Sequence, residues 1–123
     1  MEHTVDDYTV DARVVIETPY RGNGYKDLEI NIRYARACMR DCLLRGELPF
    51  ASHLLYTQEG ILNDRHPLER TQGINAGLEW AKAAKFTIVY EDRGYSAGME
   101  AGIRAAKEAG RPVIYRRLAG WKE

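Results

Sequence analysis

Residues 86–110 constrain the fold more than any other part of this 123-residue sequence. They open with β-branched and aromatic residues (FTIVY), break at Asp92-Arg93-Gly94, and resume with apolar residues at helical spacing. The pattern predicts a strand, a tight turn and a helix, which is half of a βαβ unit. In open α/β folds, ligands bind at the carboxyl edge of the parallel sheet. We therefore expect functional residues in the turn after this strand.

The rest of the chain alternates in the same way. Further strands are predicted at residues 12–17, 49–56 and 111–118, and helices at residues 27–45 and 68–84. Asp27 suits the N-cap of the first helix, Gly46 its end, and Pro67 the start of the second helix. Alternating strands and helices predict a three-layer α/β/α sandwich around a four- to five-stranded, mostly parallel sheet of the Rossmann-like or flavodoxin-like type.

Composition limits the domain count and the class of partner. Residues 1–11 are acidic with little apolar periodicity and are expected to form a flexible N-terminal arm, while residues 12–123 form a single domain. Eighteen Lys and Arg balance eighteen Asp and Glu, so no overall field attracts nucleic acid or an anionic membrane. No apolar run approaches the ~20 residues of a membrane span, and no signal peptide is evident. We expect a cytoplasmic protein without nucleic-acid or membrane partners.

Three residues with reactive side chains have simpler interpretations. Cys38 and Cys42 are four residues apart on one helical face, which favours two buried packing residues over a metal or disulfide site. His53 lies in an apolar run, and such a histidine is more often hydrogen-bonded in a core than catalytic. We find no set of His, Cys and Asp ligands, so neither a metal nor a cofactor is expected.

Two loops are expected to converge if the first strand neighbours the strand that begins near residue 86. The first loop is TPYRGNGYKD, and its glycines, tyrosines and cations suit a ligand loop. Ser96 is a natural N-cap, and the free N–H groups after it could hold an anion. The sequence contains neither GxxxxGK[ST] nor GxGxxG, so the P-loop and dinucleotide fingerprints do not apply. The candidate residues are Thr18, Tyr20, Arg21, Gly22, Asn23, Asp92, Gly94, Tyr95, Ser96, Gly98 and Glu100.

Two of these residues are carboxylates with a possible catalytic role. Glu100 falls in the first turn of the predicted helix, where the helix dipole favours its ionised form by about 0.3–1 kcal/mol. A positioned carboxylate can attack a sugar anomeric carbon, and Asp92 could donate or accept the accompanying proton. The alternative is that Glu100 only complements the dipole and Asp92 only caps the turn.

Pro19-Tyr20 and the pattern D-x-G-(x)5-E-x-G-x-x-A, formed by residues 92–105, resemble the nucleoside 2-deoxyribosyltransferase-like superfamily. This superfamily includes deoxynucleoside 5′-monophosphate N-glycosidases and small phage-encoded relatives, and the resemblance covers residues 12–45 and 85–118. It implies that Glu100 attacks C1′, that Tyr20 orients Glu100, and that Asp92 contacts the substrate. The implied substrate-binding residues are Pro19, Arg21, Gly22, Asn23, Gly94, Tyr95, Ser96 and Gly98. The superfamily's commoner spacing places the glutamate three residues after a Gly-Thr pair, whereas here Gly94-Tyr95 precedes Glu100 by a longer segment.

The sequence therefore leads to two main functional hypotheses. The first is an N-glycosidase or deoxyribosyltransferase that acts on a nucleoside or nucleotide through a glycosyl-Glu100 intermediate. The second is a non-catalytic binder, or sponge, for a nucleotide-derived signalling molecule. A third and weaker hypothesis is a purely structural module. Arg21 and the Ser96 helix start predict a preference for a 5′-phosphate.

Assembly is predicted from the helix at residues 68–84. Its apolar stripe is thin, and the large aromatics Trp80 and Tyr56 have no place on the predicted core faces. The resembled superfamily also forms oligomers whose sites are completed across subunits. We expect a homodimer or larger homo-oligomer.

Overall fold

Strands and helices alternate through residues 12–123, which the computed structural model describes. The arm predicted for residues 1–11 lies outside the described residues. The elements in chain order are β1 (Arg13–Glu17), α1 (Tyr25–Leu44), β2 (Leu48–Phe50), α2 (Ser52–Leu55), α3 (Pro67–Ala81), β3 (Phe86–Tyr90), α4 (Ala97–Glu108) and β4 (Val113–Arg116).

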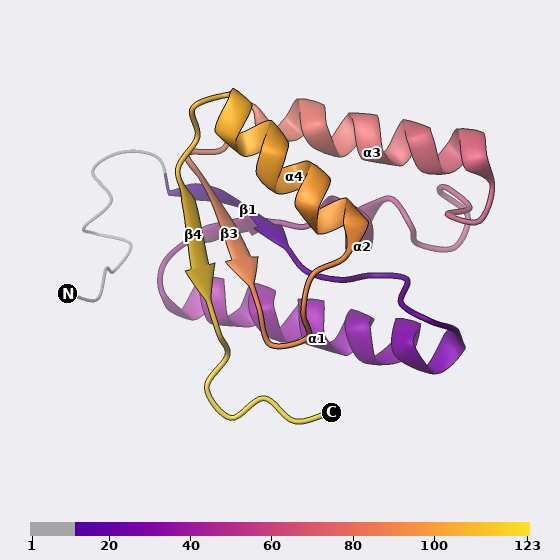
Figure 1. Ribbon diagram of the computed structural model, residues 1–123, viewed down its shortest axis with the longest axis horizontal. Coiled ribbons are helices and arrows are strands. Elements are labelled where there is room, and N and C mark those ends of the chain that lie inside the picture. Colours follow the sequence, from indigo (N-terminus) through magenta and orange to yellow (C-terminus); the bar gives the residue numbers. More distant parts are fainter. Residues whose placement is uncertain (1–11) are drawn as a thin grey trace.

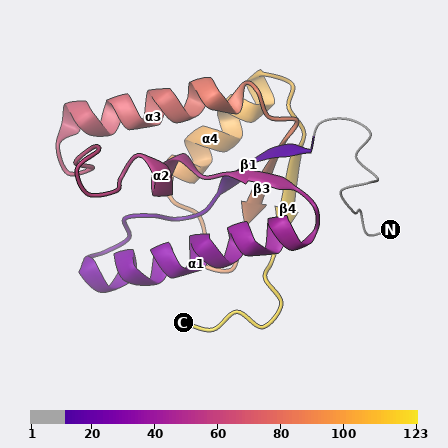
Figure 2. The same cartoon turned by 180° about the vertical axis from the view of Figure 1, so that it is seen from behind.

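The four strands form one parallel sheet in the order β2-β1-β3-β4. Helix α1 covers one face of the sheet, and α3 and α4 cover the other (Figure 1). The view from behind shows the same three layers, with α2 on the side of the short edge strand β2 (Figure 2). The predicted α/β/α sandwich is confirmed. Because the chain turns toward opposite faces after β1 and after β3, the point between these two strands is the topological switch point of the sheet.

The larger part of the core lies between the sheet and α1. The side chains of Tyr34, Cys38 and Cys42 are fully buried there and pack against β1 and β3, with Ile16 and Ile88 in the same cluster. Both cysteines are free thiols, so the interpretation of the pair as buried packing residues is confirmed.

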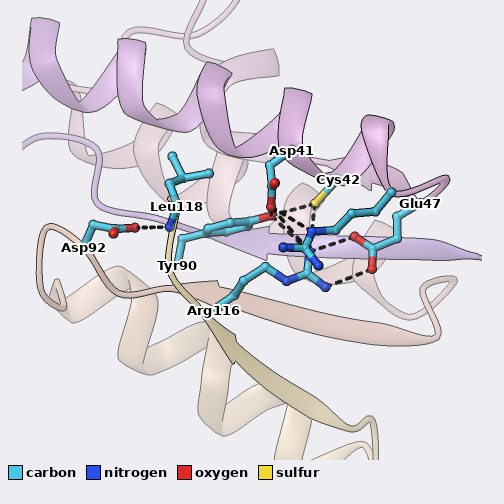
Figure 3. A network of polar contacts seen from close by, with 8 residues as sticks. Asp41, Cys42, Glu47, Tyr90, Asp92, Arg116 and Leu118 are labelled. Atoms are coloured by element: carbon cyan, nitrogen blue, oxygen red, sulfur yellow. Dashed lines mark hydrogen bonds and ion pairs between the residues drawn. The ribbon is translucent and has the colours of Figure 1, made fainter. Parts of the chain in front are cut away.

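A polar network joins α1 and the segment after it to strands β3 and β4 (Figure 3). The Tyr90 hydroxyl donates to Asp41 Oδ2 over 2.8 Å and lies 3.3 Å from Cys42 Sγ. The Arg116 guanidinium donates to both carboxylate oxygens of Glu47, each over 2.9 Å, and lies over the Tyr90 ring. Burial raises the pKa of Cys42 to about 12, so this thiol stays protonated. The network ties together α1, the segment before β2, and strands β3 and β4.

The opposite face is more thinly packed. Its core cluster consists of Val89, Met99 and Ile103, with Val113 against it. Helix α3 buries only Gly77 and Ala81 among its fifteen residues. Its exposed apolar side chains are Leu68, Ile74, Leu78 and Trp80.

The strand predicted at residues 49–56 is wrong in its second half. Strand β2 ends at Phe50, and Ser52–Leu55 forms the single helical turn α2, in which the N–H groups of Leu54 and Leu55 donate to the Ala51 carbonyl. The turn brings Ser52 directly against Gly77 of α3, where a Cβ on the glycine would lie 2.5 Å from Ser52 Oγ. A longer strand would lose this contact between α2 and α3.

Other boundaries shift by a few residues. Helix α1 begins at Tyr25 with Gly24 as its N-cap, so Asp27 lies inside the first turn and is not the cap. Helix α3 ends at Ala81 and β4 spans Val113–Arg116, both shorter than predicted.

Candidate active site

The carboxyl ends of β1 and β3 lie side by side at the switch point. Strands β1 and β3 pair in parallel, and Glu17 at the end of β1 is in register with Val89. The loop after β1 and the turn after β3 therefore flank the same point, which is the convergence that the sequence predicted. Ligands of open α/β sheets bind at such points.

The loop after β1 lines an open cleft of about 900 Å³. Tyr20, Arg21 and Gly22 form part of one wall, and the segment at residues 57–65 forms the other. Arg21 spans the cleft: its Nε donates to Asp64 Oδ2 over 3.0 Å, and its guanidinium also donates to the Asp64 carbonyl over 2.5 Å. Because Asp64 already holds this cation, an anionic ligand must compete with a carboxylate for Arg21. Asp64 was not predicted from the sequence.

His53 joins the ends of β1 and β2. Its Nε2 lies 2.7 Å from the Thr18 hydroxyl, and its ring meets the Tyr20 ring edge to face at 5.9 Å. Burial lowers the pKa of His53 to about 4, so the ring is neutral near pH 7. His53 is thus hydrogen-bonded, as expected, and it positions the loop that carries Tyr20.

Asp92 faces α1 instead of the cleft. Its carboxylate accepts hydrogen bonds from the Tyr34 hydroxyl over 2.5 Å and from the Leu118 N–H over 3.0 Å. Its own N–H donates to the Tyr34 oxygen over 2.9 Å, and the Trp121 ring packs on Tyr34 at 4.9 Å. These contacts fix the C-terminal segment against α1. A role for Asp92 in proton transfer stays a prediction.

Glu100 lies in the first turn of α4 and is exposed. Ser96 caps this helix, as predicted, by accepting the Met99 N–H over 3.1 Å. The face of α4 that packs on the sheet carries Met99, Gly102, Ile103 and Ala106, and Glu100 is off this face. Within residues 12–123, no hydrogen bond joins Glu100 to Tyr20. The predicted pairing of a nucleophile with its orienting tyrosine is therefore not formed in this structure.

The remaining predicted residues are spread along the two loops. Pro19 is buried at the end of β1, and Asn23 is exposed with its N–H bound to Asp27. Gly94 has a φ of +78°, which favours glycine in this turn. The Tyr95 hydroxyl donates to Glu91 over 2.5 Å, and Gly98 is exposed near the start of α4.

Sequence reasoning missed Glu17, the last residue of β1. Its carboxyl group lies against Gly102 of α4, on the face of the sheet opposite to Ile16. Burial raises the pKa of Glu17 from 4.5 to about 8, and attraction by Arg111 offsets part of this rise. The available signal was strand alternation, because Glu17 shares its face with the buried Val15.

Residues 12–123 offer neither a metal-ligand cluster nor a membrane-spanning helix. Residues 12–123 contain no cluster of three or more His, Cys, Asp or Glu side chains that could hold a metal ion. None of their helices is both long and apolar enough to cross a bilayer.

Comparison with known proteins places the chain in a family. Residues 12–116 match DUF7768, a domain of unknown function. The chain belongs to this family. No curated protein matches. Among solved structures, this DUF7768 protein is similar to a 2-deoxyribosyltransferase from the psychrotolerant bacterium Bacillus psychrosaccharolyticus, described as a biocatalyst for the synthesis of antiviral and antitumoral nucleosides.

The likeness to this transferase extends over most of both chains. The TM-score is 0.61 at 19% sequence identity, and the alignment covers 91% of the DUF7768 chain and 77% of the transferase. At this identity the comparison establishes a shared fold. The resemblance seen in the sequence is thus supported as a fold relationship.

Proposed function

We propose that the protein binds a nucleoside or its 5′-monophosphate at the switch point and cleaves or transfers its N-glycosidic bond. The observation that carries the proposal is the open cleft beside the loop after β1, next to the switch point of a sheet whose fold is similar to that of a 2-deoxyribosyltransferase. The reaction needs a carboxyl group near the anomeric carbon and a groove for the sugar and base. Glu100 is the candidate for the attack and Asp92 for the proton transfer, and Tyr20 lies in the cleft wall.

The rest of the proposed site follows the two loops. Pro19, Gly22 and Asn23 shape the first loop, and Gly94, Tyr95, Ser96 and Gly98 shape the start of α4, where free N–H groups could receive a phosphate. We further propose a cytoplasmic homo-oligomer in which α3 contributes to the subunit contact, because this helix leaves Ile74, Leu78 and Trp80 exposed.

A second candidate function is a non-catalytic binder of a nucleotide-derived signal. The separation of Glu100 from Tyr20 favours it, since a pocket that lacks a positioned nucleophile can still hold a ligand. Both functions use the same cleft and differ only in turnover.

One experiment separates the two functions. The protein is incubated with nucleosides, their 5′-monophosphates and cyclic ADP-ribose, and chromatography measures free base. Release of base supports the glycosidase or transferase, whereas intact ligand recovered after denaturing washed protein supports the binder. If neither is found with any compound of the panel, the proposed function is wrong.

A further inference from the structure

The loop after β1, residues 18–24, is attached to the first half of α1. Asn31 Nδ2 donates to the Tyr20 carbonyl oxygen over 2.9 Å. The Asn23 N–H donates to Asp27 Oδ2, also over 2.9 Å. Between these two contacts Gly22 has a φ of +62°, and a Cβ there would lie 2.6 Å from Asp27 Cβ and 3.2 Å from Asn31 Nδ2. Only glycine fits this backbone conformation and this close approach. The loop that lines the cleft therefore takes its shape from α1.

The buried side chain of Asn31 uses both ends of its amide. Its Oδ1 accepts a hydrogen bond from Arg93 Nε over 2.7 Å, while its Nδ2 donates to Tyr20. A guanidinium can only donate and a carbonyl can only accept, so these two partners fix the orientation of the amide. An aspartate of the same size would present only acceptors and could not donate to Tyr20. Asn31 is 2% exposed, so water hardly competes for either bond.

Arg93 brings the turn after β3 into the same group of contacts. Its side chain is only 10% exposed and forms ion pairs with Asp27, at 3.6 Å, and with Glu123. Asp27 and Asn31 are four residues apart on α1 and so lie on one face of this helix. The guanidinium thus contacts the two α1 residues that hold the loop after β1. The two segments that flank the switch point are connected through these residues.

We infer that Asn31 and Arg93 are positioning residues for the proposed nucleotide site. This inference rests on the proposed function. Neither residue lines the cleft, whereas Tyr20 and Arg21 do. The Arg93–Asn31–Tyr20 chain of hydrogen bonds holds the loop in one conformation before a ligand arrives. A loop that is already ordered loses less conformational freedom on binding, so the ligand is bound more tightly.

The two residues act as one unit in this arrangement. Arg93 fixes the amide of Asn31, and that amide fixes the Tyr20 carbonyl, so loss of either residue breaks the same chain of contacts. Substitutions within one such unit have non-additive effects, whereas substitutions at independent sites add. Loss of general stability would not by itself produce this coupling in ligand affinity.

The test measures the affinity of the wild type, Asn31→Ala, Arg93→Ala and the double variant for the four 2′-deoxynucleosides and their 5′-monophosphates. Calorimetry gives the affinity, and KM replaces it for any compound from which base is released. Each single variant should bind at least about tenfold more weakly than the wild type, and the double variant should match the weaker single variant within about threefold. Arg36→Ala, an exposed position on the same helix, is the control and should stay within about twofold.

The possible results separate the inference from the proposed function. Single variants that bind within threefold of a wild type that binds overturn the inference and leave the proposed function standing. A double variant whose loss equals the product of the two single losses also overturns it, because the two residues would then act separately. A wild type that binds none of the eight compounds overturns the proposed function and the inference with it.

A measurement without ligand guards against a folding artefact. Asn31→Asp keeps the size of the side chain and the acceptor for Arg93 but loses the donor for Tyr20, so its affinity should fall as far as that of Asn31→Ala. Deuterium uptake by residues 18–24 should rise in Asn31→Asp, while uptake by β3 and the circular dichroism spectrum stay as in the wild type. Wild-type uptake by residues 18–24 in this variant overturns the inference, whatever the protein binds.

Discussion

Replacing Glu17 by glutamine should stabilise the protein, and by more at high pH than at low pH. In the folded chain burial raises the pKa of Glu17 from 4.5 to about 8. Between these two values the unfolded chain has lost the proton and the folded chain keeps it, so wild-type stability falls as pH rises through this window. The difference of about 3.5 pH units corresponds to at most about 5 kcal/mol, since one unit is about 1.36 kcal/mol. That is a large share of the ~5–15 kcal/mol that stabilises a typical domain.

Urea unfolding of the wild type and Glu17→Gln from pH 5 to 9, followed by tryptophan fluorescence, measures this effect directly. The stability advantage of Glu17→Gln should be small at pH 5, should grow through pH 6 and 7, and should level off near pH 8. Titration of all other groups is common to both proteins and cancels in the difference. An advantage that stays constant across this pH range would show that the carboxyl group is not held in its neutral form by the fold.

Four other predictions concern acid stability, the contacts of Asp92, the preference for a 5′-phosphate and the assembly. Because burial lowers the pKa of His53 to about 4, the wild type should lose up to about 3 kcal/mol as pH falls from 6.5 to 4, and His53→Gln should lose less in the same unfolding assay. Tyr34→Phe leaves the Asp92 N–H and carboxylate without their partner and should cost about 1–3 kcal/mol; an unchanged denaturation midpoint would count against the contact. The wild type should bind 5′-monophosphates more tightly than nucleosides in calorimetry, and Asp64→Asn, which weakens the hold on Arg21, should widen the difference; equal affinities would oppose a phosphate site. Light scattering should give a mass of a dimer or larger assembly, and a value near 14 kDa with and without nucleotide would contradict the predicted assembly.

The layers of the fold were predictable because local patterns determine them. The β-branched runs at β1 and β3, the Pro67 helix start and the Ser96 cap all depend on residues within one or two turns of each other. The apolar run after β2 was ambiguous, since periodicity alone does not separate a short strand from one helical turn. The helical turn α2 brings Ser52 against Gly77, and this contact joins segments that are distant in the sequence, so local periodicity does not indicate it.

The sequence indicated that the loops after β1 and β3 converge, which the pairing of these strands confirms, but it did not indicate the contacts within the loops. Tyr20 and Arg21 line an open cleft, and their role in binding stays a prediction. The sequence could not show that Arg21 is held by Asp64, or that Glu17 rests on Gly102, because each pair joins residues more than forty positions apart. Strand alternation indicates which face a side chain takes, whereas the residue that it meets there depends on the whole fold.

The unequal packing of the two faces of the sheet has a consequence for local opening of the chain. On one face the Tyr90–Asp41 contact holds α1 to β3, and the Arg116–Glu47 contact holds the segment after α1 to β4. On the other face α3 buries only two of its residues. Amide protons of α3 and of the cleft wall before it should therefore exchange with solvent through small openings, while those of α1 and β3 exchange only when the whole domain unfolds. A ligand that bridges the cleft would slow exchange first in α3, so deuterium uptake of this helix reports on binding even where no reaction occurs.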